Sequence, residues 1–302
     1  MKYNISKDFK MLTKFRGPSN TFYYRLAKVA LSFVPKGMKS SKDLTIKKIK
    51  IKTRDNKKIS TYFIKPKNVD KCAPVIFYFH GGGFVFKAAP YQYRYAKEYA
   101  KQANSIVVFV DYRLAFCSPF NAPLNDCVDA YRYYLKNAEI FGIDKNKIAV
   151  AGDSAGGWLA IMTALTSHQE NLPTPKCQML IYPVIDNRSQ TPSMQKFVDT
   201  PVWDSCLNKK MWKTYLQGNT LPNILDYDDL SFMPSTYIEL AQFDCLRDEA
   251  ILLRKSLQKS GVNVITHDTQ QTIHGYDLFS KSKITQDSLA KRYAFLSQEL
   301  QD

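Results

Sequence analysis

Residues 152–157 read Gly-Asp-Ser-Ala-Gly-Gly, and the first five of them fit the pattern G-x-S-x-G around Ser154. An apolar, β-branched run at 148–151 precedes this stretch, and apolar residues at helical spacing follow it as far as Leu165. A strand, a sharp turn and a helix in this order form a nucleophile elbow, in which small neighbours let the turn expose a serine oxygen. We therefore predict that Ser154 is a nucleophile, and the rest of the chain must supply its partners.

Around this turn, short unbroken apolar runs alternate with amphipathic helical patterns. The runs predict strands near 75–79, 106–110, 148–151, 179–181, 236–240 and 262–266. The helical patterns lie near 91–102, 124–135, 247–260 and 282–300, and from Ala155 onward. Such alternation is typical of an α/β fold with a mostly parallel central sheet and helices on both faces. The length of 302 residues suits a single domain over 1–302 with an inserted part.

Three stretches depart from the alternation. Residues 44–53 alternate apolar and polar side chains with a one-residue slip, and 59–64 return after a polar turn, so we predict a hairpin whose first strand has a bulge. Residues 187–229 are rich in proline, polar and aromatic side chains and predict an inserted helical part of a cap. A helix is expected over 20–34, with an apolar face that must cover something, formed by Phe22, Leu26, Val29, Ala30 and Phe33.

A serine nucleophile needs a base, because its hydroxyl is otherwise unreactive at neutral pH. His168 falls at the far end of the helix behind the elbow, and His267 lies within a predicted strand. His274 follows the last strand, where the chain order serine, acid, histidine puts the base. Although a lone histidine is more often structural, its position and this order favour His274.

The acid that orients this base should lie at the end of the preceding strand. The run 236–240 leads through three residues into Asp244, thirty positions before His274. Asp248 and Glu249 compete, but they belong to the first turn of the next helix, where acids are expected because of the helix dipole alone. We therefore predict Asp244 as the acid.

The glycine-rich stretch 79–84, Phe-His-Gly-Gly-Gly-Phe, directly follows a predicted strand. Its glycines let the backbone approach a ligand closely and point amide N–H groups inward. A phosphate-binding loop is the rival interpretation, but no Lys-Ser/Thr pair follows and no helix begins at once. HGGG is the element that complements an elbow serine, so we predict an oxyanion hole, supported by His80 and Gly81, with donors from Gly82, Gly83 and Ala155.

Five motifs taken together are far more specific than any one of them. They are HGGGF at 80–84, DYRLA at 111–115, GDSAGGWLA at 152–160, DCLRDE at 244–249 and HGYD at 274–277. In kind and order this set resembles the hormone-sensitive-lipase-like esterases of the α/β-hydrolase fold, over about residues 45–300.

The resemblance implies Ser154, Asp244 and His274 as a catalytic triad and the HGGG loop as oxyanion hole. It also implies a cap built from the amino-terminal helices, about 1–40, together with about 187–229. Three positions depart from the family pattern: Phe116 and Cys117 follow DYRLA in place of proline and an acid, and Trp158 replaces a commoner asparagine. These departures put loop packing and pocket shape in doubt, while every catalytic part is present.

From these residues we expect a carboxylic-ester hydrolase for short to medium acyl chains that works through an acyl-enzyme and needs no metal or organic cofactor. Two alternatives stay open: a small amide or peptide hydrolase on the same fold, and a non-catalytic protein that binds a small ligand. Turnover of matched esters and amides separates the first alternative, and fluorophosphonate labelling of Ser154 separates the second.

The net charge of +16 lies entirely in residues 1–67, which carry 19 Lys and Arg against three acids, while the remainder is balanced. A solvated basic face is the simpler interpretation, and weak attraction to anionic substrates or anionic lipid surfaces is the alternative. Nothing in the sequence indicates specific nucleic-acid binding, a signal peptide, a membrane span or a metal site, and the six cysteines are scattered. We expect a cytoplasmic protein with a small-molecule ester substrate, and a homodimer stays open.

Overall fold

The computed structural model describes residues 2–17, 20–34 and 36–301, and within them eight strands form one sheet. The strands are β1 (Leu44–Lys52), β2 (Lys58–Pro66), β3 (Ala73–Phe79), β4 (Ile106–Asp111), β5 (Ile143–Asp153), β6 (Cys177–Ile181), β7 (Ser235–Phe243) and β8 (Val264–Ile273). Their order across the sheet is β1-β2-β4-β3-β5-β6-β7-β8. The pairs β1–β2 and β2–β4 are antiparallel, and the other neighbouring pairs are parallel. The predicted mostly parallel sheet is confirmed.

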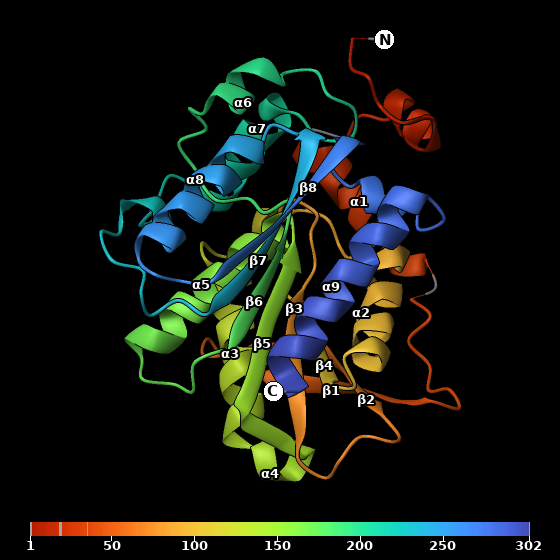
Figure 1. Ribbon diagram of the computed structural model, residues 1–302, viewed down its shortest axis with the longest axis vertical. Helices are drawn as coiled ribbons and strands as arrows, with labels where there is room; N and C mark the ends of the chain where they lie inside the picture. The colour runs from red at the N-terminus through yellow and green to blue at the C-terminus, as the bar shows by residue number, and fades with distance from the viewer. Residues whose placement is uncertain (1, 18–19, 35, 302) are drawn as a thin grey trace.

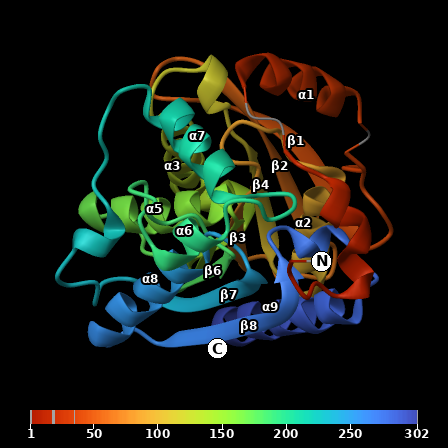
Figure 2. The same ribbon diagram turned by 90° about the horizontal axis from the view of Figure 1, so that it is seen from above.

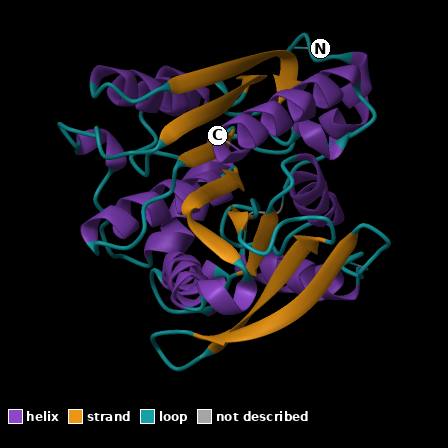
Figure 3. Cartoon of the chain, turned by 60° about the horizontal axis from the view of Figure 1, so that its bottom comes forward, coloured by secondary structure: helices purple, strands orange, loops and turns teal. Residues whose placement is uncertain are grey.

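Helices cover both faces of this sheet (Figures 1 and 3). One face carries α2 (Pro90–Gln102) and α9 (Lys283–Gln301), and the other carries α3 (Ala122–Lys136), α5 (Ala155–Gln169) and α8 (Arg247–Lys259). The short α4 (Ala138–Phe141) lies at the end of the molecule away from the strand tips (Figure 1). Every residue of β3 is buried, because helices cover it on both sides, and this explains its unbroken apolar sequence.

The amino-terminal hairpin is present, but the predicted bulge is wrong. The register of β1 against β2 runs without a break from Leu44 opposite Pro66 to Lys52 opposite Lys58. The one-residue slip in the sequence has another cause. Leu44 joins the core on one face of the sheet and Ile51 joins the core on the other, so a regular edge strand contributes apolar side chains to both layers.

The expected helix over 20–34 is α1 (Thr21–Phe33), but the face that we expected to be buried is exposed. Tyr24 is its one buried residue, and it packs edge-on against Phe86. The exposed large side chains lie on another side of the helix and are Phe22, Tyr23, Leu26, Val29 and Phe33. Amphipathic spacing thus marked an apolar face correctly but could not show whether the protein covers it.

Two segments lie at the end to which the parallel strands point (Figures 1 and 2). The first contains the 3₁₀ helix η1 (Lys7–Lys14) and α1. The second is 187–229, with α6 (Pro192–Lys196), α7 (Ser205–Leu216) and the turn η3 (Ile224–Asp226). The segments are joined, because the N–H of Val202 donates to the carbonyl of Phe15 at 2.9 Å and Lys2 pairs with Asp199 at 2.9 Å.

Candidate active site

Ser154 occupies the turn between β5 and α5 with φ 55° and ψ −120°. A side chain at positive φ is strained, and such strain persists only where the surroundings fix the backbone. Close packing fixes it here: a Cβ on Gly152 would overlap the carbonyl of Gly156, and a Cβ on Gly156 would overlap the carbonyl of Phe79. The N–H of Ser154 also donates to the carbonyl of Ile181 at 2.8 Å. The glycines of G-x-S-x-G therefore let the turn sit against its neighbours.

The structure brings Ser154, His274 and Asp244 together at the carboxyl ends of the strands. Nε2 of His274 lies 2.8 Å from Oγ of Ser154, and its Nδ1 lies 2.7 Å from Oδ2 of Asp244. The carboxylate accepts a hydrogen bond from Nδ1–H, so the ring keeps its proton on Nδ1. Nε2 is then free to accept the proton of the serine hydroxyl. Asp244 also accepts the N–H of Leu246 at 3.0 Å. All three side chains are buried.

The glycine-rich loop lies beside this group, and both Gly82 and Gly83 have positive φ, at 114° and 57°. The carbonyl of Gly82 accepts the N–H groups of Val85 and Phe86, which closes a tight turn. Among the described residues, no hydrogen bond uses the N–H of Gly82, Gly83 or Ala155. These three donors, which we predicted from the sequence, are thus available to a ligand.

His80 braces this loop from below. Its Nδ1–H donates to the carbonyl of Gly81 at 2.7 Å, and its ring stacks on Tyr112 with centroids 4.2 Å apart. The hydroxyl of Tyr112 donates to the carbonyl of His80 at 2.7 Å. Because burial disfavours the charged ring, the pKa of His80 is lowered to about 4. The side chain is neutral near pH 7 and acts as a support.

Asp153 joins the elbow to the glycine-rich loop, a role that we did not assign from the sequence. Its carboxylate accepts three hydrogen bonds: from the hydroxyl of Tyr78 at 2.7 Å, from the N–H of Gly81 at 3.0 Å and from Nε2 of Gln92 at 2.7 Å. Burial raises its pKa to about 6 even though these donors favour the ionised form. The signal was an acid inside a motif of small residues, beside the nucleophile.

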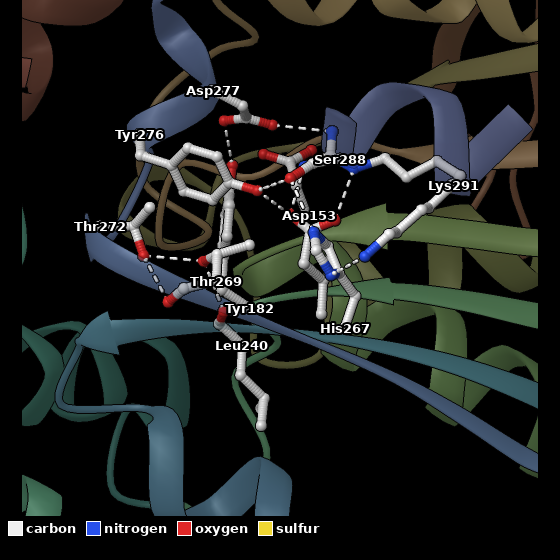
Figure 4. Close-up of polar contacts among 12 residues, drawn as sticks. Asp153, Tyr182, Leu240, His267, Thr269, Thr272, Tyr276, Asp277, Ser288 and Lys291 are labelled. Carbon is white, nitrogen blue, oxygen red and sulfur yellow. Dashed lines mark hydrogen bonds and ion pairs between the residues drawn. The ribbon is translucent and has the colours of Figure 1, made fainter. Parts of the chain in front are cut away.

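A second buried network supports the loop that carries His274, and Figure 4 shows its members Tyr182, Tyr276 and Asp277. Arg292 of α9 is fully buried and binds Glu239 of β7 at 2.5 Å and Asp277 at 2.9 Å. Asp277 accepts the hydroxyl of Tyr182 at 2.5 Å, and the Tyr182 ring packs edge-on against the His274 ring at 4.7 Å. Pairing with Arg292 lowers the pKa of Glu239 against the effect of burial. These long-range contacts leave no local pattern, so the sequence did not reveal them.

A cavity of about 630 Å³ opens above Ser154, His274, Gly82 and Gly83. Its other walls are mainly apolar and come from η1, α1, the loop around Trp203 and the turn after His274. Their side chains are Met11, Leu12, Phe15, Ala27, Ala30, Leu31, Val202, Trp203, Leu278 and Phe279, and Phe86 joins them from the loop after Gly83. Among the described residues that line the cavity, segment 187–229 contributes only Val202 and Trp203.

The described part of the chain contains no group of three or more His, Cys, Asp or Glu side chains that could bind a metal ion. The six cysteines are free thiols. Of the helices in the described ranges, none has both the length and the hydropathy that a membrane crossing requires.

Comparisons with known proteins agree with the observed fold. A family model described as alpha/beta hydrolase fold matches residues 76–278. Over 210 residues the chain is 35% identical to the esterase LipI of Mycobacterium tuberculosis, covering 68% of this chain and 66% of LipI. Over 215 residues it is 34% identical to the carboxylesterase NlhH of the same organism, covering 68% of this chain and 67% of NlhH. The crystal structure of the esterase LipW from Mycobacterium marinum superposes with a TM-score of 0.89 at 25% identity, over 98% of this chain and 96% of LipW.

Proposed function

Because this chain belongs to the α/β-hydrolase fold family, among its hormone-sensitive-lipase-like members, we propose that it hydrolyses carboxylic esters with Ser154 as nucleophile. His274 acts as general base and then general acid, and Asp244 orients it. The observation that carries this proposal is the continuous pair of hydrogen bonds from Ser154 Oγ through the His274 ring to Asp244, at 2.8 and 2.7 Å. The relatives LipI, an esterase, and NlhH, a carboxylesterase, support ester hydrolysis. The chain matches each of them over about two thirds of its length.

Each residue has a defined step in the proposed reaction. Nε2 of His274 takes the hydroxyl proton while Oγ of Ser154 attacks the acyl carbon, and Asp244 stabilises the imidazolium that forms. The N–H groups of the oxyanion loop and of Ala155 stabilise the tetrahedral oxyanion, each donor contributing on the order of 10²–10³ in rate. His274 then protonates the leaving alcohol. Water, activated by the same ring, releases the acid and restores Ser154.

We further propose that the two segments at the strand tips, about 1–40 and 187–229, act as a cap that selects the ester. Side chains from both segments line the cavity, and about 630 Å³ suits a ligand of drug-like size. We therefore expect short to medium acyl chains. Hydrolysis rates across a series of p-nitrophenyl esters of increasing acyl length will test this, and a preference for long chains would contradict it.

The mechanism is tested by replacing its parts one at a time. We expect Ser154→Ala and His274→Ala each to lower kcat for p-nitrophenyl butyrate by about 10⁴-fold or more, because the triad acts as one unit. His168→Ala is the matched control, because His168 is exposed at the end of α5 and stacks only on Phe232. Ser154→Ala should also abolish labelling by a fluorophosphonate. Near wild-type hydrolysis by either triad variant would refute the assignment.

A further inference from the structure

The helix α1 presents a stripe of apolar side chains to solvent. Phe22, Leu26, Val29 and Phe33 follow one another at intervals of four, three and four residues, so they lie along one side of the helix. Phe22 is 65% exposed and Phe33 is 82% exposed. A soluble surface seldom exposes so many large side chains together, and such patches mark sites of interaction.

Exposed apolar side chains also lie at the mouth of the cavity. Met11 on η1 is 77% exposed, Phe15 directly after η1 is 56% exposed, and both side chains also line the cavity. Leu31 lines it as well, from the side of α1 opposite the stripe, and Ala30 lies between the two sides. Exposed apolar side chains therefore lie both on the outer side of α1 and at the mouth of the cavity. Both elements that carry them lie at the end to which the strands point (Figure 2).

The same two elements carry exposed basic side chains. Lys7, Lys10, Lys14 and Arg16 belong to η1 or follow it, and Arg25 lies on α1. Within the part of the chain that the structure describes, none of these five forms a salt bridge. The only acid between residues 7 and 34 is Asp8, and it accepts a hydrogen bond from Ser282. The two elements that carry the exposed apolar side chains therefore also carry a net positive charge.

These observations select one partner. A second copy of the chain would bring two basic surfaces together, and mutual repulsion opposes that contact. An anionic lipid surface offers both complements, since acyl chains take up the apolar side chains and headgroups attract the lysines and arginines. We propose that η1 and the outer stripe of α1 dock the protein on anionic lipid surfaces, with the mouth of the cavity facing the lipid.

The consequence for substrate choice rests on the proposed ester hydrolysis, whereas the docking does not. Esters that partition into a lipid surface would reach Ser154 without first entering bulk water. Vesicle binding is therefore measured with Ser154→Ala, so that a failure of the docking and a failure of the proposed catalysis are seen separately.

The test is co-sedimentation of Ser154→Ala with vesicles of phosphatidylcholine, with and without about one quarter phosphatidylserine. We expect binding to the anionic vesicles to exceed binding to the neutral ones by about tenfold, and to weaken as salt is added. Adding Phe22→Glu and Phe33→Glu, neither of which lines the cavity, should lower binding to the anionic vesicles by about tenfold or more.

The matched control is Ile140→Glu, because Ile140 is 80% exposed on α4 at the opposite end of the molecule (Figure 1). This variant should bind as its parent does. Lys10→Glu combined with Lys14→Glu should abolish the preference for anionic vesicles. Equal binding by the stripe variants and the parent would overturn the proposal. A second outcome would also overturn it. In that outcome, size-exclusion chromatography with light scattering shows a wild-type dimer that the stripe substitutions dissociate, and neither the wild type nor the stripe variants bind vesicles.

Discussion

The cavity has two walls of opposite construction. Toward the sheet, the Arg292 network and Asp153 hold the catalytic loops with buried, mutually satisfied polar contacts. Toward solvent, η1 and α1 form a wall of apolar side chains, and Tyr24 is the one buried residue of α1. A reaction that depends on the relative positions of several hydrogen-bonded side chains needs the rigid, polar wall. Selection of a substrate by shape and hydrophobicity needs only the second. Substitutions in the two walls should therefore differ greatly in their effects.

The largest effect is expected at Arg292. Arg292→Met removes a buried cation and leaves Glu239 and Asp277 unpaired, which should lower the free energy of unfolding by about 3–5 kcal/mol. The matched control lies on the same helix, where Lys283 pairs with Asp287 on the surface, and Lys283→Met should cost less than about 1 kcal/mol. Urea denaturation at pH 7 measures both. Similar losses for the two variants would break the comparison.

A smaller effect, on rate more than on stability, is expected at Gly81. A Cβ there would overlap the carboxylate and the carbonyl oxygen of Asp153, so Gly81→Ala should displace the oxyanion loop and lower kcat by about 10²-fold. Gly218→Ala is the control, because a Cβ at Gly218 meets nothing within 4 Å although φ is 84°. It should cost about 1 kcal/mol of stability and leave kcat unchanged. Unchanged kcat in Gly81→Ala would argue against the loop as oxyanion hole.

The polar wall should also respond to pH. His80 has a pKa of about 4 in the folded protein, below its ordinary value of 6.5, so its contribution to stability is present above pH 6.5 and is lost as the pH falls toward 4. The slope is at most about 1.4 kcal/mol per pH unit. Because His80→Phe cannot gain a proton, its free-energy deficit relative to wild type should shrink between pH 6.5 and pH 4.5.

Asp153 should act in the opposite direction over a similar range. Its pKa is raised from 3.8 to about 6, so it favours the folded state below pH 3.8 and this advantage is lost as the pH rises through 6. Urea midpoints for wild type and His80→Phe at several pH values separate the two groups. A deficit of His80→Phe that stays constant across the range would exclude titration of His80.

The smallest effect is expected behind the apolar wall, on the outer side of α1. Phe33→Ser removes a side chain that is almost fully solvated, so the free energy of unfolding should change by no more than about 0.5 kcal/mol. Hydrolysis of a short, water-soluble ester should be unchanged. Thermal unfolding and p-nitrophenyl acetate turnover check these points, and a loss of more than about 1 kcal/mol would show that Phe33 has a packing partner.

The sequence predicted the parts of the molecule that depend on neighbouring residues. Unbroken apolar runs such as 75–79 and turn glycines such as Gly156 act within a few positions, and chain order alone connected Ser154 with His274. The partners of Arg292 lie far away in the sequence and become visible only when α9 packs on the sheet. The prediction that the apolar face of α1 is covered is wrong for another reason. Helical spacing shows which side chains share a face but not whether that face meets protein or solvent.

The link between Phe15 and Val202 has a practical consequence for anyone who wants to exchange specificity between relatives. Through this hydrogen bond and the pairing of Lys2 with Asp199, the amino-terminal segment and residues 187–229 hold each other above the strands. If only one segment were replaced by that of a relative, the new segment would pack against the unchanged native segment, to which its surface is not matched. In the sequence, strands β1 to β6 lie between the two segments. The segments nevertheless form one structural unit and should be exchanged together.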